Sequence, residues 1–224
     1  MAVISTTTTA SRRSLTTIER YREMMPATEA ADAKLETLIG QATNAIERHL
    51  GRIVARERVT ELLRQAPDDV YLVLERKPVT TIHGITVDGA AFASTHYSLD
   101  GPAAGTVRLV SGPNALWDEL IGYGPSGGDY GYRSGPPSTV RYEVDYTAGW
   151  LVPDATEGAR DLPADLEMAC QVMVRAMLEQ QERQLGLSAE RLGDASWTYN
   201  AGKTSADLID PVRGILDRYR SVVL

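Results

Sequence analysis

The hydrophobic spacing changes twice along this 224-residue chain, and this change limits the possible fold more than any other feature. Near both ends, apolar residues return every three or four positions, which indicates amphipathic helices. Between them, short β-prone runs are separated by turn residues, which indicates strands. Helices from the two ends must pack together to bury their apolar faces. The sequence therefore predicts an α+β protein, in which an antiparallel β domain is inserted into a small bundle of about four helices.

Four segments have helical spacing and carry recognisable start or stop signals. Thr16 and Glu19 have capping-box spacing at the start of the first, and Pro26 forbids its continuation. Gly51 is placed for a left-handed cap at the end of the second. Ser205 is a candidate N-cap for the fourth. The predicted helices cover residues 15–25, residues 30–50, about 20 residues from Pro163 onward, and residues 205–219.

Six short runs in the middle of the chain are predicted to be strands. The pair Asp88-Gly89 is a hairpin turn signal, and Asp100-Gly101-Pro102 marks another turn. A further short strand is expected at residues 195–199. The predicted strands of the β domain are 56–63, 70–74, 80–87, 97–99, 106–110 and 139–147.

These patterns divide the chain into four parts. Residues 1–13 contain four consecutive threonines and two adjacent arginines but almost nothing apolar, and are predicted to be a flexible N-terminal arm. Residues 14–52 form the first part of the helical bundle, and residues 151–224 form its second part and a C-terminal tail. Residues 53–150 form the β insertion. Within it, the Gly/Tyr-rich loop 122–137 has six glycines and is too long for an ordinary connection.

Charge and cysteine content exclude several classes of protein. Thirty acidic and 23 basic residues give a net charge of -7, which is the wrong sign for gripping nucleic acid phosphates. The single cysteine, Cys170, excludes an intramolecular disulfide and a cysteine-based metal site. No apolar stretch has the length of a signal peptide or a membrane span. We therefore expect a protein made in the cytoplasm, or assembled there into something larger, with no membrane partner.

Two strings imitate nucleotide-binding motifs, but their context does not fit. Residues 122–127 spell GxGxxG, yet Pro125 and the following glycines prevent the helix that must receive the phosphates. Gly202-Lys203-Thr204 resembles the end of a P-loop, but Trp197 stands where the first glycine of that motif is required. Both strings are predicted to be loops or turns.

No other pattern predicts catalysis or metal binding. The histidines His49, His83 and His96 are far apart, and zinc needs three or four converging ligands. No GxSxG turn is present to hold a nucleophilic serine. We therefore expect a protein that is not an enzyme and that has no catalytic residue, cofactor or metal.

Several stretches, taken in order, resemble one protein family. The opening LTTIERYREMM and the helix end AIERHLGR are followed by LVLERKPVTTIHGITVDG, a strand, turn, strand and Asp-Gly hairpin. HYSLDGPAAGTVRL and VRYEVDYTAGW come next, then LPADLEMAC and ERLGDASWTY. Together these stretches, over about residues 14–221, resemble the head-tail connector (adaptor) proteins of tailed bacteriophages and gene transfer agents. The Thr-rich arm and loop 122–137 depart from that pattern.

The resemblance implies a structural protein of the virion neck, assembled in the host bacterial cytoplasm. It implies a ring, usually of twelve subunits, that docks under the portal protein and presents a platform to the stopper or tail. DNA would pass through the lumen without specific binding, and we predict that the lumen is net negative. The alternatives are another neck protein, either a stopper or a tail terminator, and a small nucleotide-binding protein.

The resemblance also points to candidate contact residues. It implies that the C-terminal end engages the portal, although a tail folded back on its own bundle is the alternative. In loop 122–137 the tyrosines and an arginine are candidates for contacts on the tail side or in the lumen. The candidates are Tyr219, Arg220, Val222, Val223 and Leu224 at the C-terminal end, and Tyr123, Tyr130, Tyr132 and Arg133 in the loop.

Overall fold

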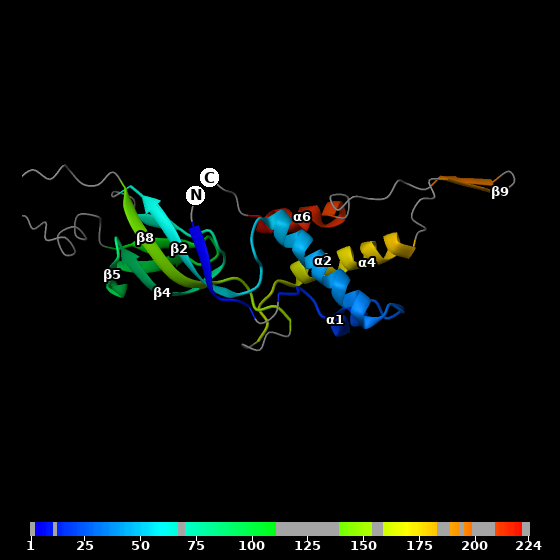
Figure 1. The fold of residues 1–224 in the computed structure, drawn as a ribbon, viewed down its shortest axis with the longest axis horizontal. Helices are drawn as coiled ribbons and strands as arrows, with labels where there is room; N and C mark the ends of the chain where they lie inside the picture. The colour runs from blue at the N-terminus through cyan, green and yellow to red at the C-terminus, as the bar shows by residue number, and fades with distance from the viewer. Residues whose placement is uncertain are drawn as a thin grey trace, which may run out of the picture. The chain divides into compact units, whose positions relative to one another are not determined.

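The structure, a computed structural model, describes residues 3–10, 13–66, 70–110, 139–153, 159–182, 189–192, 195–198 and 209–220. Contacts divide the chain into two compact units, which are residues 1–10 with 56–149 and residues 11–55 with 150–224. The first unit is built from strands and the second mainly from helices (Figure 1). The predicted α+β class is confirmed, and the chain crosses between the units close to the predicted boundaries at 52/53 and 150/151.

The β unit contains two antiparallel sheets, one with strand order β1-β2-β8-β4-β5 and one with strand order β3-β7-β6. All six strands predicted for the β domain are present. Asp88 and Gly89 form the predicted hairpin turn between β4 and β5, both at positive φ. His96 lies in the short helix η1, directly before β6. The elements are β1 (Val3–Thr8), β2 (Glu57–Gln65), β3 (Tyr71–Val73), β4 (Val79–Val87), β5 (Ala90–Phe92), η1 (Ser94–His96), β6 (Tyr97–Gly101), β7 (Thr106–Leu109) and β8 (Val140–Ala148).

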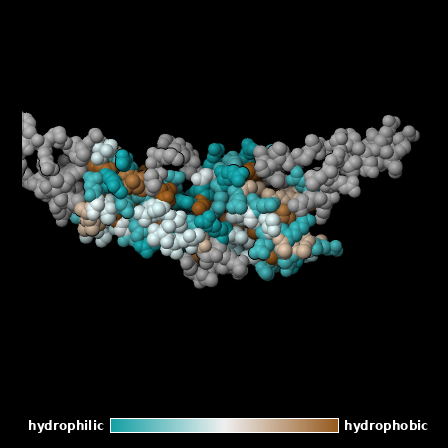
Figure 2. Space-filling view, viewed as in Figure 1, coloured by the Kyte–Doolittle hydropathy of each residue, from teal (hydrophilic) through white to brown (hydrophobic). Residues whose placement is uncertain are grey.

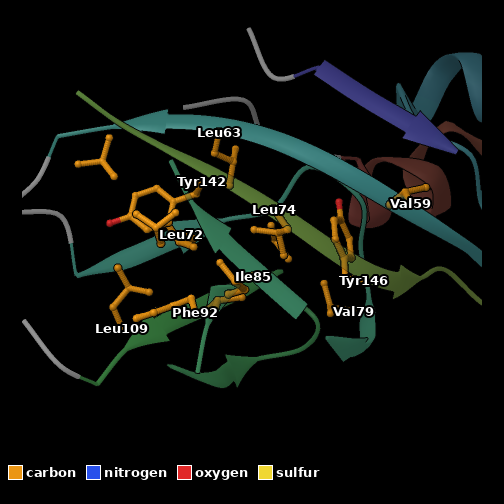
Figure 3. Packing of buried hydrophobic residues seen from close by; sticks show 14 of the residues in the cluster. Val59, Leu63, Leu72, Leu74, Val79, Ile85, Phe92, Leu109, Tyr142 and Tyr146 are labelled. Atoms are coloured by element: carbon orange, nitrogen blue, oxygen red, sulfur yellow. The ribbon is translucent and has the colours of Figure 1, made fainter. Parts of the chain in front are cut away.

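A single apolar cluster joins the two sheets. Side chains alternate along β8, so that Tyr142, Val144 and Tyr146 are buried while the residues between them are more exposed. Leu72 and Val107 enter the same cluster from the smaller sheet and are fully buried. Figure 3 shows these side chains converging from both sheets. The β unit is therefore a sandwich of two sheets around one core.

The N-terminal segment differs from its prediction. Residues 3–8 form β1, an edge strand paired antiparallel with β2 from Val3 opposite Leu62 to Thr8 opposite Arg58. Threonine and other β-branched residues suit a pleated, half-exposed edge, and Ile4 packs against the core. The prediction of a flexible arm over 1–13 is therefore wrong for residues 3–8, because β2 supplies the pairing that the local sequence lacks.

The helical unit is built around two long helices that pack on each other, α2 (Asp32–Leu50) and α4 (Ala164–Glu182). Gly51 ends α2 at φ 70°, as predicted. The shorter α1 (Ile18–Met24) begins at Thr17, whose hydroxyl accepts a hydrogen bond from Arg20 N; Thr16 is buried instead. The buried side chains of the long helices are Leu35, Leu38, Ile39, Ala42, Thr43, Ile46 and Leu50 of α2, and Leu166, Glu167, Ala169, Cys170, Gln171, Met173, Val174 and Leu178 of α4.

The C-terminal part of the helical unit contains shorter elements. The strands β9 (Ala189–Leu192) and β10 (Ala195–Thr198) pair antiparallel, so the predicted strand near 195–199 is present. The predicted last helix is described from residue 209, and its candidate cap Ser205 lies outside the described residues. It consists of η2 (Asp210–Val212), α6 (Arg213–Leu216) and η3 (Asp217–Tyr219), with Val212 and Leu216 buried.

Candidate partner-binding surfaces

The exposed large hydrophobic residues of the β unit gather on its smaller sheet. In the described part of that unit they are Val70, Tyr71 and Val73, which lie in or beside β3, and Val110 at the end of β7. Their exposed fractions run from 43% for Val70 to 58% for Val110. Figure 2 shows one face of the molecule, where hydrophobic positions form small brown patches among hydrophilic ones. A cluster of this kind marks a candidate contact surface for another protein.

The strand geometry defines this candidate surface further. Tyr71 and Val73 flank the buried Leu72, so their side chains point to the outer face of the smaller sheet. Directly after β3, Leu74 N donates to Gly105 O, just before β7, at 2.8 Å. In an antiparallel pair every second residue bonds to the neighbouring strand, so Leu72 and Leu74 are the residues whose backbone groups face β7. The backbone groups of Tyr71 and Val73 therefore point to the open edge of β3, where a strand from a partner can pair. We call Tyr71, Val73 and this open edge the β3 surface.

The outer face of the larger sheet is polar by contrast. The Arg58 Nη2 atom lies 2.5 Å from an Asp145 carboxylate oxygen, and this ion pair lowers the pKa of Asp145. His83 Nε2 lies 2.7 Å from the Thr147 hydroxyl, and the Thr80 hydroxyl donates to the Thr147 carbonyl. These side chains satisfy one another and water, so this face needs no partner to cover it.

At the C-terminal end, Tyr219 is engaged within its own unit. Its hydroxyl donates to both carboxylate oxygens of Asp165 at 2.8 Å, and its ring meets Trp150 edge to face at 6.0 Å between centroids. Burial and the bond to Asp165 raise the pKa of Tyr219 to about 12. Arg220 is exposed. These contacts fix Tyr219 directly before the tail, and the predicted portal contact of Tyr219, Arg220 and the residues after them stays a prediction.

Several predicted features lie outside the described residues. They include the C-terminal candidates Val222, Val223 and Leu224 and the string Gly202–Thr204. Loop 122–137 lies outside as well, and with it Tyr123, Tyr130, Tyr132 and Arg133. Five acidic residues from the middle of the chain also lie outside the described residues, namely Asp68, Asp69, Asp118, Glu119 and Asp129. The proposals for these residues stay predictions.

A buried carboxylate holds the helical unit together at a point that sequence reasoning missed. Glu167 in the first turn of α4 is 4% exposed and pairs with Arg20 of α1 and with Arg160, whose Nη1 lies at 2.8 Å. The Thr16 hydroxyl donates to Glu167 at 3.2 Å and accepts from Gln171. This Glu167 network ties α1, α4 and the segment before α4. The sequence did contain one sign that Glu167 is buried, because it directly follows Leu166 on the apolar side of the predicted helix.

A second buried carboxylate lies inside the β unit. Glu61 is 1% exposed and accepts hydrogen bonds from the Tyr146 hydroxyl at 2.5 Å and from Glu75 N at 3.1 Å. Burial raises the pKa of Glu61 above its ordinary value, and it also raises the pKa of Tyr146. The alternation of β2 gave the signal, since Glu61 falls between the inward-facing Val59 and Leu63.

Nothing in the described part of the chain resembles a reaction centre. No group of three or more His, Cys, Asp or Glu side chains among those residues could hold a metal ion. Cys170 is fully buried beside the Thr43 hydroxyl, and burial raises the pKa of its thiol to about 12, so it is not a reactive nucleophile. None of the described helices is long and apolar enough to cross a membrane.

Comparison with known proteins finds one family model and several solved structures that are similar to this chain. Residues 14–123 match the model of the head completion protein family. Over 99% of its length the chain also matches a protein chain in the neck of an empty gene transfer agent (GTA) particle, with a TM-score of 0.54 and 17% identity, and 97% of that chain is covered. These matches bear out the resemblance to head-tail connector, or neck, proteins that the sequence suggests.

Two further solved structures share the fold of this chain. A chain in the neck of a native GTA particle, computed with C12 symmetry, matches with a TM-score of 0.52 and 16% identity. A chain in the virion of a native GTA particle matches with a TM-score of 0.51 and 17% identity. In both, 99% of this chain and 97% of the other are covered. No curated protein matches. The resemblance inferred from the sequence is confirmed at the level of a structural protein of the virion neck.

Proposed function

We propose that this connector protein is an adaptor subunit, and that twelve copies form a ring between the portal and the stopper or tail. One observation carries the proposal. The fold matches nearly the whole length of a chain in a GTA neck computed with C12 symmetry, so the likeness includes the helical unit, the β unit and the order in which the chain passes through them. Because the two chains share only 16% identity, symmetry and partners come to this chain as proposals.

The described residues suit a structural subunit better than an enzyme. The β unit has one continuous apolar core, and the Glu167 network cross-links the helical unit. Such a protein needs rigid units that present surfaces, and no reactive group. We therefore propose that its work is done by contacts with copies of itself, with the portal and with the stopper or tail.

The C-terminal tail is proposed to contact the portal. Arg220 is exposed directly after η3, and it is followed by Val222, Val223 and Leu224, an apolar end that suits insertion into a protein groove. Deleting residues 221–224 should leave both units folded and abolish binding to the portal. Portal binding at wild-type affinity by the shortened chain would contradict this assignment.

The β3 surface and loop 122–137 are proposed to serve the other contacts. The β3 surface offers an open strand edge beside exposed apolar side chains, which suits a neighbouring subunit or a tail-side protein. In the loop, Tyr123, Tyr130, Tyr132 and Arg133 are candidates for the tail side or the lumen. Crosslinking from each of these positions within assembled necks would identify its partner.

DNA is proposed to pass through the ring without being held. The net charge of -7 opposes adhesion to phosphates, although at physiological salt this repulsion reaches only about 8 Å. We therefore predict a lumen that is net negative. A solved ring with a channel lined by lysine and arginine would contradict the prediction.

Electron microscopy of the purified protein, alone and mixed with portal, tests the whole proposal. A ring seated on the portal is the expected result. Binding to tail proteins with no affinity for the portal would instead favour a stopper or a tail terminator. The remaining alternative, a small nucleotide-binding protein, is tested by measuring thermal stability with added nucleotides. A true ligand at 100 times its dissociation constant would add about 2.7 kcal/mol of stability.

A further inference from the structure

The last described turn of the chain is fixed by contacts from three separate parts of the helical unit. The Tyr219 hydroxyl donates to Asp165 at the start of α4, and the Tyr219 ring packs edge to face on Trp150. The Tyr219 carbonyl accepts a hydrogen bond from Arg52 Nη2 at 2.6 Å. All three contacts hold the residue after which the proposed portal-binding tail begins. We call Arg52, Trp150, Asp165 and Tyr219 the C-terminal clamp.

Two members of the clamp belong to the segments by which the chain enters and leaves the β unit. Arg52 follows the end of α2, three residues before Ala55, and Trp150 is the first residue after the β unit. These segments are joined to each other, because Trp150 N donates to Val54 O at 3.0 Å and Ala55 pairs with Trp150 in a parallel bridge. We call these two segments, residues 52–55 and Trp150, the chain crossings. The turn at Tyr219 therefore contacts both of them.

Electrostatics explains why Arg52 occupies this position. Its guanidinium carbon lies 5.2 Å from the centre of the Trp150 ring, where a cation is attracted by the negative face of the indole. The carbonyls at the end of a helical segment carry partial negative charge, and Arg52 donates to one of them. Burial lowers the pKa of Arg52, but a guanidinium keeps its charge, so these contacts offset its loss of water.

We propose that the C-terminal clamp positions the tail for docking and links the tail to the two chain crossings. The proposal rests on the proposed function, in which the tail binds the portal. A segment whose base is already fixed loses less freedom on binding, so it binds more tightly than a segment with a free base. The four clamp residues are positioning residues, and Arg220 and the residues after it make the contact.

The substitution Tyr219→Phe gives the sharpest test, because it keeps the ring and removes the bond to Asp165. We expect portal affinity to fall about three- to tenfold, because a base that this bond no longer holds must be ordered on binding. Tyr97→Phe, at another half-buried tyrosine but in the β unit, should leave the affinity unchanged. Both variants should keep the wild-type thermal midpoint to within a few degrees, which excludes unfolding as the cause.

Hydrogen exchange tests the link to the chain crossings independently of the portal. In Tyr219→Phe the Trp150 amide, which is bonded to Val54 O, should exchange faster than in wild type, while the amides of β8 should not change. Asp165→Asn should have the same effect, and the double variant should add little to either single variant, since both remove one bond. Unchanged exchange at Trp150 in Tyr219→Phe would overturn the link.

The dependence on the tail separates positioning from a general structural effect. A chain that ends at Arg220 should no longer bind the portal, and Tyr219→Phe in that chain should cause no further change in portal binding. Wild-type portal affinity in full-length Tyr219→Phe, with faster exchange at Trp150, would overturn the positioning role. If the wild-type chain itself did not bind portal, the proposed function would fail, whereas exchange at Trp150 would still report on the clamp.

Discussion

The two units of this protein are stabilised in different ways. The β unit depends on one apolar cluster that both sheets share, and its buried carboxylates include Glu61, which is bonded to Tyr146, and Glu57. The helical unit buries apolar side chains too, but it also uses charged groups, in the Glu167 network and in the C-terminal clamp. Apolar packing tolerates many partners, whereas a buried charge requires particular ones. The helical unit should therefore be the more sensitive to loss of a single polar group.

The largest effect is expected from Leu72→Ala in the β unit. Leu72 is fully buried in β3, so its truncation leaves a cavity and should lower the free energy of unfolding by about 3 kcal/mol. Val73→Ala, on the same strand but 53% exposed, should cost less than about 0.5 kcal/mol. Denaturant titration measures both. Hydrogen exchange adds a second measurement. If Leu72→Ala accelerated amide exchange in α2 and α4 as much as in the β unit, the two units would unfold as one.

Glu167→Ala gives the corresponding test in the helical unit. It removes the shared partner of Arg20 and Arg160, and the arginines keep some water because the Arg20 side chain is 41% exposed. The expected loss is about 2 kcal/mol. Glu179→Ala is the matched control on the same helix, since its pair with Arg175 is exposed and worth about 0.3 to 0.5 kcal/mol. Equal losses in the two variants would contradict the importance of buried charge in this unit.

One glycine in each unit allows the effect of an added Cβ atom to be compared between the units. Gly51 and Gly105 both have left-handed backbones, at φ 70° and 68°. A Cβ at Gly51 would meet nothing within 4 Å, but one at Gly105 would lie 2.9 Å from the Leu74 carbonyl oxygen. Gly51→Ala should cost about 1 kcal/mol from backbone strain alone. Gly105→Ala should cost about 2 kcal/mol by the same titration, and the reverse order would refute this steric argument.

The smallest effect is a pH dependence in the β unit. Because burial raises the pKa of Glu61, the folded state binds its proton more readily than the unfolded state does. Its contribution is therefore most favourable below the unfolded pKa near 4.5, and it declines as pH rises through the folded pKa. Glu61→Gln should remove this decline, so the variant should gain stability relative to wild type as pH increases over that range. Glu143→Gln, exposed in β8, should show no such trend.

Much of the fold could be predicted from the sequence because its local signals are strong. The 3.6-residue spacing gave α2 and α4, Gly51 gave the end of α2, and Asp88-Gly89 gave the hairpin between β4 and β5. Strand β1 was missed because its polar threonines carry no apolar alternation, and only the edge of β2 makes them a strand. Such pairing joins residues fifty or more positions apart, which no local pattern contains.

The candidate contact surfaces were less accessible to sequence reasoning. The sequence pointed to the C-terminal segment as a portal contact, which stays a prediction, but it contained no sign that Tyr219 bonds to Asp165. Arg52 and Trp150 lie 98 positions apart and come together only because the chain leaves and re-enters the helical unit at neighbouring points. The β3 surface was also missed, since exposure of Tyr71 depends on which face of the strand the core covers.

The sequence by itself determined the helices, the strands, the place where one pattern changes to the other and the family resemblance. Each of these follows from the spacing of neighbouring residues. The tertiary structure alone decided which polar groups are buried and with what partner. Glu167, Glu61 and Arg52 resemble surface residues in the sequence, and only folding removes the first two from water and Arg52 in part. Removing a charge from water is favourable only where partners converge on it, and in this protein those partners come from distant parts of the chain.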